Sequence, residues 1–199
     1  MKLRAWMRMT WPLVPIIAAL VVTSLILILF ETSPKTALAA MIEGSFGDSS
    51  KVLQVLAFLV PLMLAASGLL VTFTAGLWNI GVEGQIIIGA LMASWVALKI
   101  DLPAPLQISL EILAAMAGGA AWAGLIALLK TRGGVSEIFS GLALNNLAII
   151  LTNYLISGPW QPPEGGTFRG TAPFADNALL PLLGESRFSP LSLGMAIIA

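Results

Sequence analysis

Residues 76–85 read Gly-Leu-Trp-Asn-Ile-Gly-Val-Glu-Gly-Gln, a glycine-rich polar stretch that separates two long apolar runs. If such runs form membrane helices, each needs about 20 apolar residues to cross the hydrocarbon. The downstream run, residues 85–100, gives only about 24 Å at about 1.5 Å per residue. We therefore expect part of the 76–85 segment to lie below the membrane surface, covered by protein or by a water-filled cavity. An ordinary short cytoplasmic loop is the alternative.

The composition is that of an integral membrane protein. Hydrophobic residues make up 58% of the chain and charged residues 10%, with a mean hydropathy of +0.95, whereas soluble domains carry about 25% charged residues. Ten basic residues balance ten acidic ones, so nucleic acid is not indicated as a partner. Histidine and cysteine are absent, which excludes His-based acid–base catalysis, thiol nucleophiles and Cys/His metal sites. No P-loop motif for a nucleotide occurs.

The apolar runs predict an all-α fold, a polytopic transmembrane helix bundle with one interrupted helix pair, as a single domain over residues 1–199. Five complete helices and the start of a sixth are expected, over residues 12–30, 52–75, 85–100, 106–129, 135–156 and 191–199. A signal peptide is the alternative for the first run, but that run exceeds the roughly 7–15 residues of a signal-peptide core. The last run is too short to cross a membrane, so we expect the chain to be part of a longer protein.

Two long segments connect these helices. Residues 31–51 are predicted to form a polar connection, and residues 158–190, rich in proline and glycine, a long outer loop. The basic residues within 1–9 and 130–132 are crowded into short segments, whereas the others are spread over longer ones. The positive-inside rule then places the N-terminus in the cytoplasm and the 158–190 loop outside.

Several polar groups are predicted at membrane depth. Glu83 and Glu137 lie at or near the hydrocarbon on the cytoplasmic side, where an acidic side chain is costly and usually marks a functional position. Glu83 comes just before a predicted helix, so capping that helix and gating a path are equally open roles. Asn79 and Gln85 can hydrogen-bond either unwound backbone or a polar solute.

The fifth predicted helix carries a stripe of small and polar residues along one face. At 100° per residue the stripe consists of Glu137, Gly141, Asn145, Ala148 and Thr152. Such a stripe either lines an aqueous path or holds helices together, and the length of this one favours a path.

These stretches resemble the signature of a known family. The 76–85 segment, followed by Ile88-Gly89-Ala90, resembles bacterial ATP-binding-cassette (ABC) importer permeases of the simple sugar and purine nucleoside branch, which is related to branched-chain amino acid permeases. The segment of helix five resembles the same family through Gly134-Val135-Ser136-Glu137-Ile138, Leu144-Asn145-Asn146, Asn153-Tyr154-Leu155 and Gly158-Pro159-Trp160. Family members usually have Asn-Glu or a similar pair where this chain has Ser136-Glu137.

The resemblance implies a permease subunit that forms the translocation pathway for a nucleoside or simple sugar, in the bacterial inner membrane. It implies a second permease subunit, identical or different, a cytoplasmic ABC ATPase that holds the ATP, and an external solute-binding protein. The chain itself is then no enzyme and needs no cofactor. The pathway or gating candidates are Asn79, Gly81, Glu83, Gly84, Gln85, Gly141, Asn145 and Thr152. The candidates for contact with the ATPase are Lys130, Arg132 and Glu137, and those for docking the binding protein are Trp160 and Phe168.

The sequence leaves two other functions open. An ion- or proton-coupled secondary transporter would use Glu83 or Glu137 as its titrating group. An intramembrane enzyme is disfavoured by the absence of histidine and cysteine, although carboxylate chemistry stays open.

Overall fold

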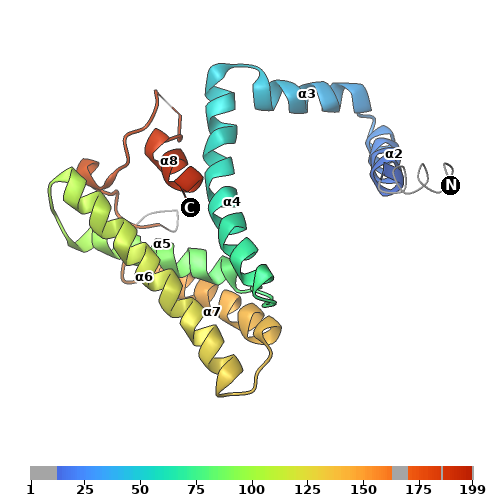
Figure 1. The fold of residues 1–199 in the computed structure, drawn as a ribbon. Helices are drawn as coiled ribbons and strands as arrows, with labels where there is room; N and C mark the ends of the chain where they lie inside the picture. The colour runs from blue at the N-terminus through green and yellow to red at the C-terminus, as the bar shows by residue number, and fades with distance from the viewer. Residues whose placement is uncertain (1–12, 163–169, 185, 199) are drawn as a thin grey trace. The chain divides into compact units, whose positions relative to one another are not determined.

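The computed structural model describes residues 13–162, 170–184 and 186–198. All regular structure in these ranges is helical, which confirms the predicted all-α fold. The elements are α2 (Leu13–Leu29), α3 (Pro34–Phe46), α4 (Ser49–Thr74), α5 (Val82–Lys99), α6 (Ala104–Thr131), α7 (Glu137–Ser157), the short 3-10 helix η1 (Asp176–Ala178) and α8 (Pro190–Ile198), as labelled in Figure 1. The basic residues near the N-terminus and Phe168, used in the predictions above, lie outside the described residues.

The chain divides into two units, residues 1–56 and 57–199. In the first unit α2 and α3 meet at a bend of 109°. The prediction of a polar connection over residues 31–51 is wrong, because most of it forms α3 and the first turn of α4. Pro34 suits the first helical turn, where its missing N–H costs nothing. The alanines, leucine and methionine that follow favour a helix despite the polar residues around them.

The start of α4 is fixed by a local cap. The Lys51 backbone N–H donates to Asp48 Oδ1 over 2.9 Å, so the carboxylate takes up one of the free N–H groups at this end. That bond, together with the nearby Lys51 charge, lowers the pKa of Asp48. The helix therefore begins at Ser49 and not at residue 52.

In the second unit α5 packs against both α6 and α7 (Figure 1). The interior of the second unit is formed by Ile88, Leu91 and Ala148, and the partly buried Trp122 and Trp160 pack against these residues. The helix α5 begins at Val82, earlier than the predicted residue 85, so Glu83 and Gly84 belong to its first turn. These two residues are thus helical, and the irregular part of the 76–85 segment ends at Gly81.

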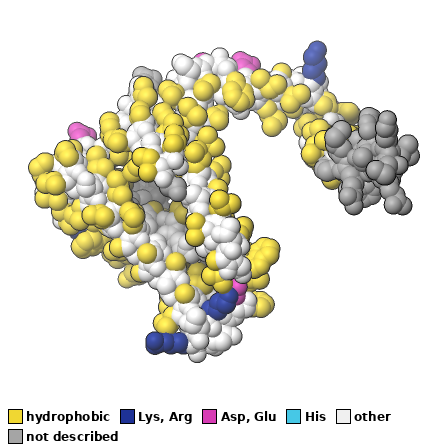
Figure 2. Space-filling view, in the orientation of Figure 1, with side chains coloured by type: hydrophobic (Ala, Val, Ile, Leu, Met, Phe, Trp, Pro, Cys, Tyr) yellow, Lys and Arg dark blue, Asp and Glu magenta, His cyan; other side chains and the backbone are white. Residues whose placement is uncertain are grey.

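Apolar side chains cover the outside of the helices. Within the described residues, four helices are each long and apolar enough to cross a membrane, namely α4, α5, α6 and α7, whereas α2 and α3 pass only as one bent pair. Figure 2 shows hydrophobic side chains along the helices with few charged ones among them. Phe58, Leu70 and Phe139 are examples that are each more than two-thirds exposed. Hydrocarbon around the protein accommodates such a surface, as the membrane prediction requires.

The long segment after α7 returns to the turn between α5 and α6. Asn177 Nδ2 donates to Asp101 Oδ1 and to the Leu102 carbonyl, both over 2.7 Å. This turn lies at the end of α5 opposite to Val82, because α5 runs from Val82 to Lys99. The described part of the 158–190 segment is therefore held at the opposite end of α5 from the 76–85 segment.

Candidate functional site

The chain leaves α4 through a glycine turn. Gly76 has a φ of +73°, which favours glycine because it has no Cβ. The Gly76 N–H donates to the Phe73 carbonyl over 3.0 Å, and the Leu77 N–H donates to the Thr72 carbonyl over 2.9 Å. This is the Schellman pattern of helix ends, and it stops α4 while satisfying its last carbonyls. Residues 77–81 then continue without regular helix until α5 begins.

Asn145 of α7 connects this irregular stretch to the start of α5. Its Oδ1 accepts the Gly84 N–H over 2.8 Å, and its Nδ2 donates to the Ile80 carbonyl over 3.0 Å. The first N–H groups of a helix lack partners within that helix. The side chain of Asn145, which lies 61 positions after Gly84 in the sequence, thus caps the start of α5. Asn145 is only 6% exposed, so both bonds are shielded from solvent.

Two glycines allow the backbone of α7 to approach this stretch closely. A Cβ on Gly141 would lie 2.9 Å from the Gly81 nitrogen and 3.3 Å from the Ile80 carbonyl carbon. A Cβ on Gly81 would overlap the end of the Ile126 side chain from α6. Ile80, Gly81 and Gly84 therefore pack against α6 and α7, and the two glycines are buried there.

Asn79 and Gln85 form a reciprocal amide pair. Asn79 Nδ2 donates to Gln85 Oε1 over 3.2 Å, and Gln85 Nε2 donates to Asn79 Oδ1 over 2.9 Å. Both side chains are half-buried. They line two clefts that are open on one side, called the larger and the smaller cavity below. The larger, of about 450 Å³, lies between α4, α5 and α6, and the smaller, of about 270 Å³, lies toward the C-terminal end of α6.

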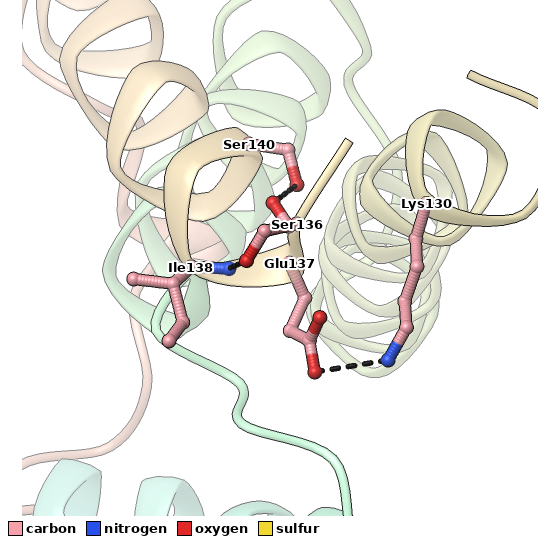
Figure 3. Close-up of polar contacts among 5 residues, drawn as sticks. All are labelled: Lys130, Ser136, Glu137, Ile138 and Ser140. Carbon is pink, nitrogen blue, oxygen red and sulfur yellow. Dashed lines mark hydrogen bonds and ion pairs between the residues drawn. The ribbon is translucent and has the colours of Figure 1, made fainter. Parts of the chain in front are cut away.

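An ion pair joins the ends of α6 and α7. Lys130 Nζ lies 2.9 Å from Glu137 Oε1, and Figure 3 shows the two side chains meeting across the helix connection. Ser136 caps α7 by accepting the Ile138 N–H over 3.3 Å. Both charged side chains are partly exposed, so the pair contributes about 0–1 kcal/mol. Both also line the smaller cavity.

The stripe of small and polar residues on the helix predicted over residues 135–156 is the buried face of α7. Gly141, Asn145 and Ala148 are buried, and Glu137 and Thr152 are half-buried. Asn145 and Gly141 contact the 76–85 segment, whereas Thr152 donates only within α7, to the Ala148 carbonyl. Whether these residues line a solute path stays a prediction.

The contacts of Asn145 and Gly141 with Ile80, Gly81 and Gly84 form one cluster. The remaining candidates lie apart from it. Glu83 is exposed in the first turn of α5, where a negative charge suits the helix dipole. Arg132 is exposed at the end of α6. Trp160 is partly buried against the interior of the unit. Their roles in gating, ATPase contact and docking stay predictions.

Two residues of the cluster are not identified by sequence reasoning. The Trp122 Nε1 atom is buried and would lie 2.8 Å from a Cβ on Gly84, as would Asn145 Oδ1. Ile126 fills the space beside Gly81. Both belong to α6, whose small residues predict close helix packing but do not show which large side chains complete it.

The sequence of this chain is similar to known permeases. The family model for the permease component of branched-chain amino acid transport systems matches residues 51–199. The glucose ABC transporter permease protein TsgB13 of Haloferax volcanii is 39% identical over 179 residues, which cover 90% of this chain and 47% of that protein. The guanosine ABC transporter permease protein NupP of Bacillus subtilis is 34% identical over 146 residues, covering 73% of this chain and 42% of that protein.

A third relative is more distant. The nucleoside ABC transporter permease protein NupB of Lactococcus lactis is 26% identical over 151 residues, covering 75% of this chain and 42% of that protein. The chain thus spans less than half the length of each of these curated relatives. No solved structure matches the chain.

Proposed function

This chain belongs to the family of branched-chain amino acid transport system permease components, and from that membership we propose that it forms part of the translocation pathway of an ABC importer. The relatives are named as permeases for glucose, guanosine and nucleosides. The proposed solute is therefore a simple sugar or a nucleoside.

The observation that carries the proposal is the interrupted backbone between α4 and α5. Such interruptions inside a membrane bundle are where transporters handle solutes. Here the interruption is held by Asn145 and by the close approach of Gly81 and Gly141. It lies at the same end of the unit as the connection between Lys130 and Glu137, and these two residues share the smaller cavity with Trp78 and Asn79.

The proposed partners follow from this role. A cytoplasmic ABC ATPase would contact the connection between α6 and α7 and would hold the ATP, so that hydrolysis takes place on another chain. A second permease subunit would complete the pathway, and an external binding protein would deliver the solute. The proposed location is the cytoplasmic membrane, with the N-terminus in the cytoplasm.

The alternative of an ion- or proton-coupled transporter is less well supported. The named relatives are ABC permeases and do not favour it. Glu137 is paired with Lys130, and Glu83 is exposed. Neither carboxylate has the isolated, buried position that suits a coupling site within a membrane.

Solute uptake into membrane vesicles tests the function. The vesicles contain the whole permease with its ATPase and binding protein, and radiolabelled glucose and guanosine are offered separately. Uptake that requires ATP and the binding protein, and survives a protonophore, supports an importer. Uptake that survives ATP depletion but collapses with the protonophore overturns it. Vesicles without the binding protein serve as the control.

A further inference from the structure

The two cavities follow one another along α6. The larger cavity touches Gly119 and Ala120, and the smaller one touches Ala127 and Lys130. Ala123, between these positions, lines both. The cavities therefore meet at about the level of Ala123, since a helix advances about 1.5 Å per residue.

The amide pair of Asn79 and Gln85 stands at this junction. Ala123 and the two amide residues are the ones that both cavities share. The pair closes on itself through two hydrogen bonds, so each amide satisfies one donor and one acceptor of the other. Carboxamides are neutral, and breaking this pair requires no separation of charge.

The larger cavity is otherwise apolar. Among the described residues that line it, Asn79 and Gln85 carry the polar side chains, and the rest are glycine, proline, alanine or larger apolar residues. A volume of about 450 Å³ lies within the roughly 300–1,000 Å³ typical of small-molecule pockets. Such a lining disfavours a charged solute, because no opposite charge offsets the loss of its hydration.

We propose that the Asn79–Gln85 pair is a gate between the two cavities, opened by a neutral solute that carries a hydrogen-bond donor beside an acceptor. Opening the pair frees one donor and one acceptor on each amide. A solute with a donor beside an acceptor satisfies one amide, and a second such set on the same solute satisfies the other, so that no amide is left without partners. The vicinal hydroxyl groups of a sugar and the edge of a nucleobase both have this chemistry, and Asn or Gln reads adenine by two such bonds. The proposal rests on the function proposed above and names the device within it.

Cysteine labelling tests the gate, because the native sequence contains no cysteine. Ala120→Cys reports on the larger cavity and Ala127→Cys on the smaller one. A water-soluble, membrane-impermeant thiol reagent is applied from whichever side labels Cys at position 120. The whole permease, assembled with its ATPase, is used throughout.

In this assay Asn79→Ala removes the pair, and we expect labelling at position 127 to rise about tenfold while labelling at position 120 stays constant. Asn146→Ala is the matched control, since Asn146 is exposed and donates only to its own helix. Glucose or guanosine added to the unsubstituted pair should also speed labelling at position 127, and comparing the two solutes shows which one opens the gate. Unchanged labelling at position 127 in Asn79→Ala overturns the proposal.

A reversible cross-link distinguishes a gating effect from a folding defect. Asn79→Cys with Gln85→Cys is oxidised to lock the pair, and we expect ATP-driven uptake to stop and to return when dithiothreitol reduces the bond. Uptake that continues through the verified cross-link also overturns the gate. If neither solute is taken up with ATP but labelling behaves as expected, the gate stands and the proposed function fails.

Discussion

Replacing Asn145 by alanine removes both hydrogen bonds that α7 makes to the start of α5. The Gly84 N–H and the Ile80 carbonyl then lose their partner. Bonds between helices in membranes are worth about 0.6 kcal/mol on average and about 1.7 kcal/mol at most. Two such bonds predict a loss of about 1–3 kcal/mol in the free energy of unfolding. A value near the upper end is favoured by the burial of Asn145.

The adjacent residue supplies the control for this experiment. Asn146 is exposed and donates to the Leu142 carbonyl of its own helix over 2.9 Å. Asn146→Ala should therefore change stability by less than about 0.5 kcal/mol. Both variants are measured by reversible denaturation of the whole purified permease in detergent.

The comparison also has a structural readout. Amide hydrogen exchange at Gly84 should accelerate in Asn145→Ala and stay unchanged in Asn146→Ala, because only the first variant frees this N–H. Equal destabilisation by the two substitutions, or an unchanged exchange rate at Gly84, would refute the capping role of Asn145.

Two further predictions concern the packing and the ion pair. Gly141→Ala places a Cβ 2.9 Å from the Gly81 nitrogen and should lower the free energy of unfolding by about 1–3 kcal/mol. The control Gly124→Ala places its Cβ in open space and should be neutral or stabilising. Equal melting temperatures for the two variants would contradict the close approach. Lys130→Ala should lower the free energy of unfolding by less than about 1 kcal/mol yet reduce ATP-driven uptake several-fold. The control Lys99→Ala, at the C-terminal end of α5, should leave uptake unchanged. Full uptake in Lys130→Ala would show that the connection between α6 and α7 does not couple ATP hydrolysis to transport.

The interruption between α4 and α5 is predictable because its cause is local. Glycines and polar residues follow one apolar run and precede a short one, and Gly76 adopts the conformation that such a turn requires. The helix α3 is missed for the opposite reason. Its polar residues suggested a connection, while Pro34 and the helix-forming residues after it decide the structure.

Contacts between distant segments are not predictable from one sequence. The stripe on α7 identifies the buried face, but its spacing does not indicate that Asn145 meets Gly84. Trp122 and Ile126 lie in a helix that is apolar all round, so no periodic pattern distinguishes the side chains that face the cluster. The pair of Asn79 and Gln85 is predictable only in part. Both residues belong to the polar segment 76–85, but their pairing depends on the turn between them.

The cap on α5 has a consequence for biogenesis. The ribosome completes α5 well before Asn145 emerges, because 61 positions separate this residue from Gly84. Until α7 enters the bilayer, the newborn α5 presents an uncapped amide that water at the membrane surface or the insertion machinery must accommodate. The start of α5 can therefore gain these two hydrogen bonds only after α7 has been made and has packed against it.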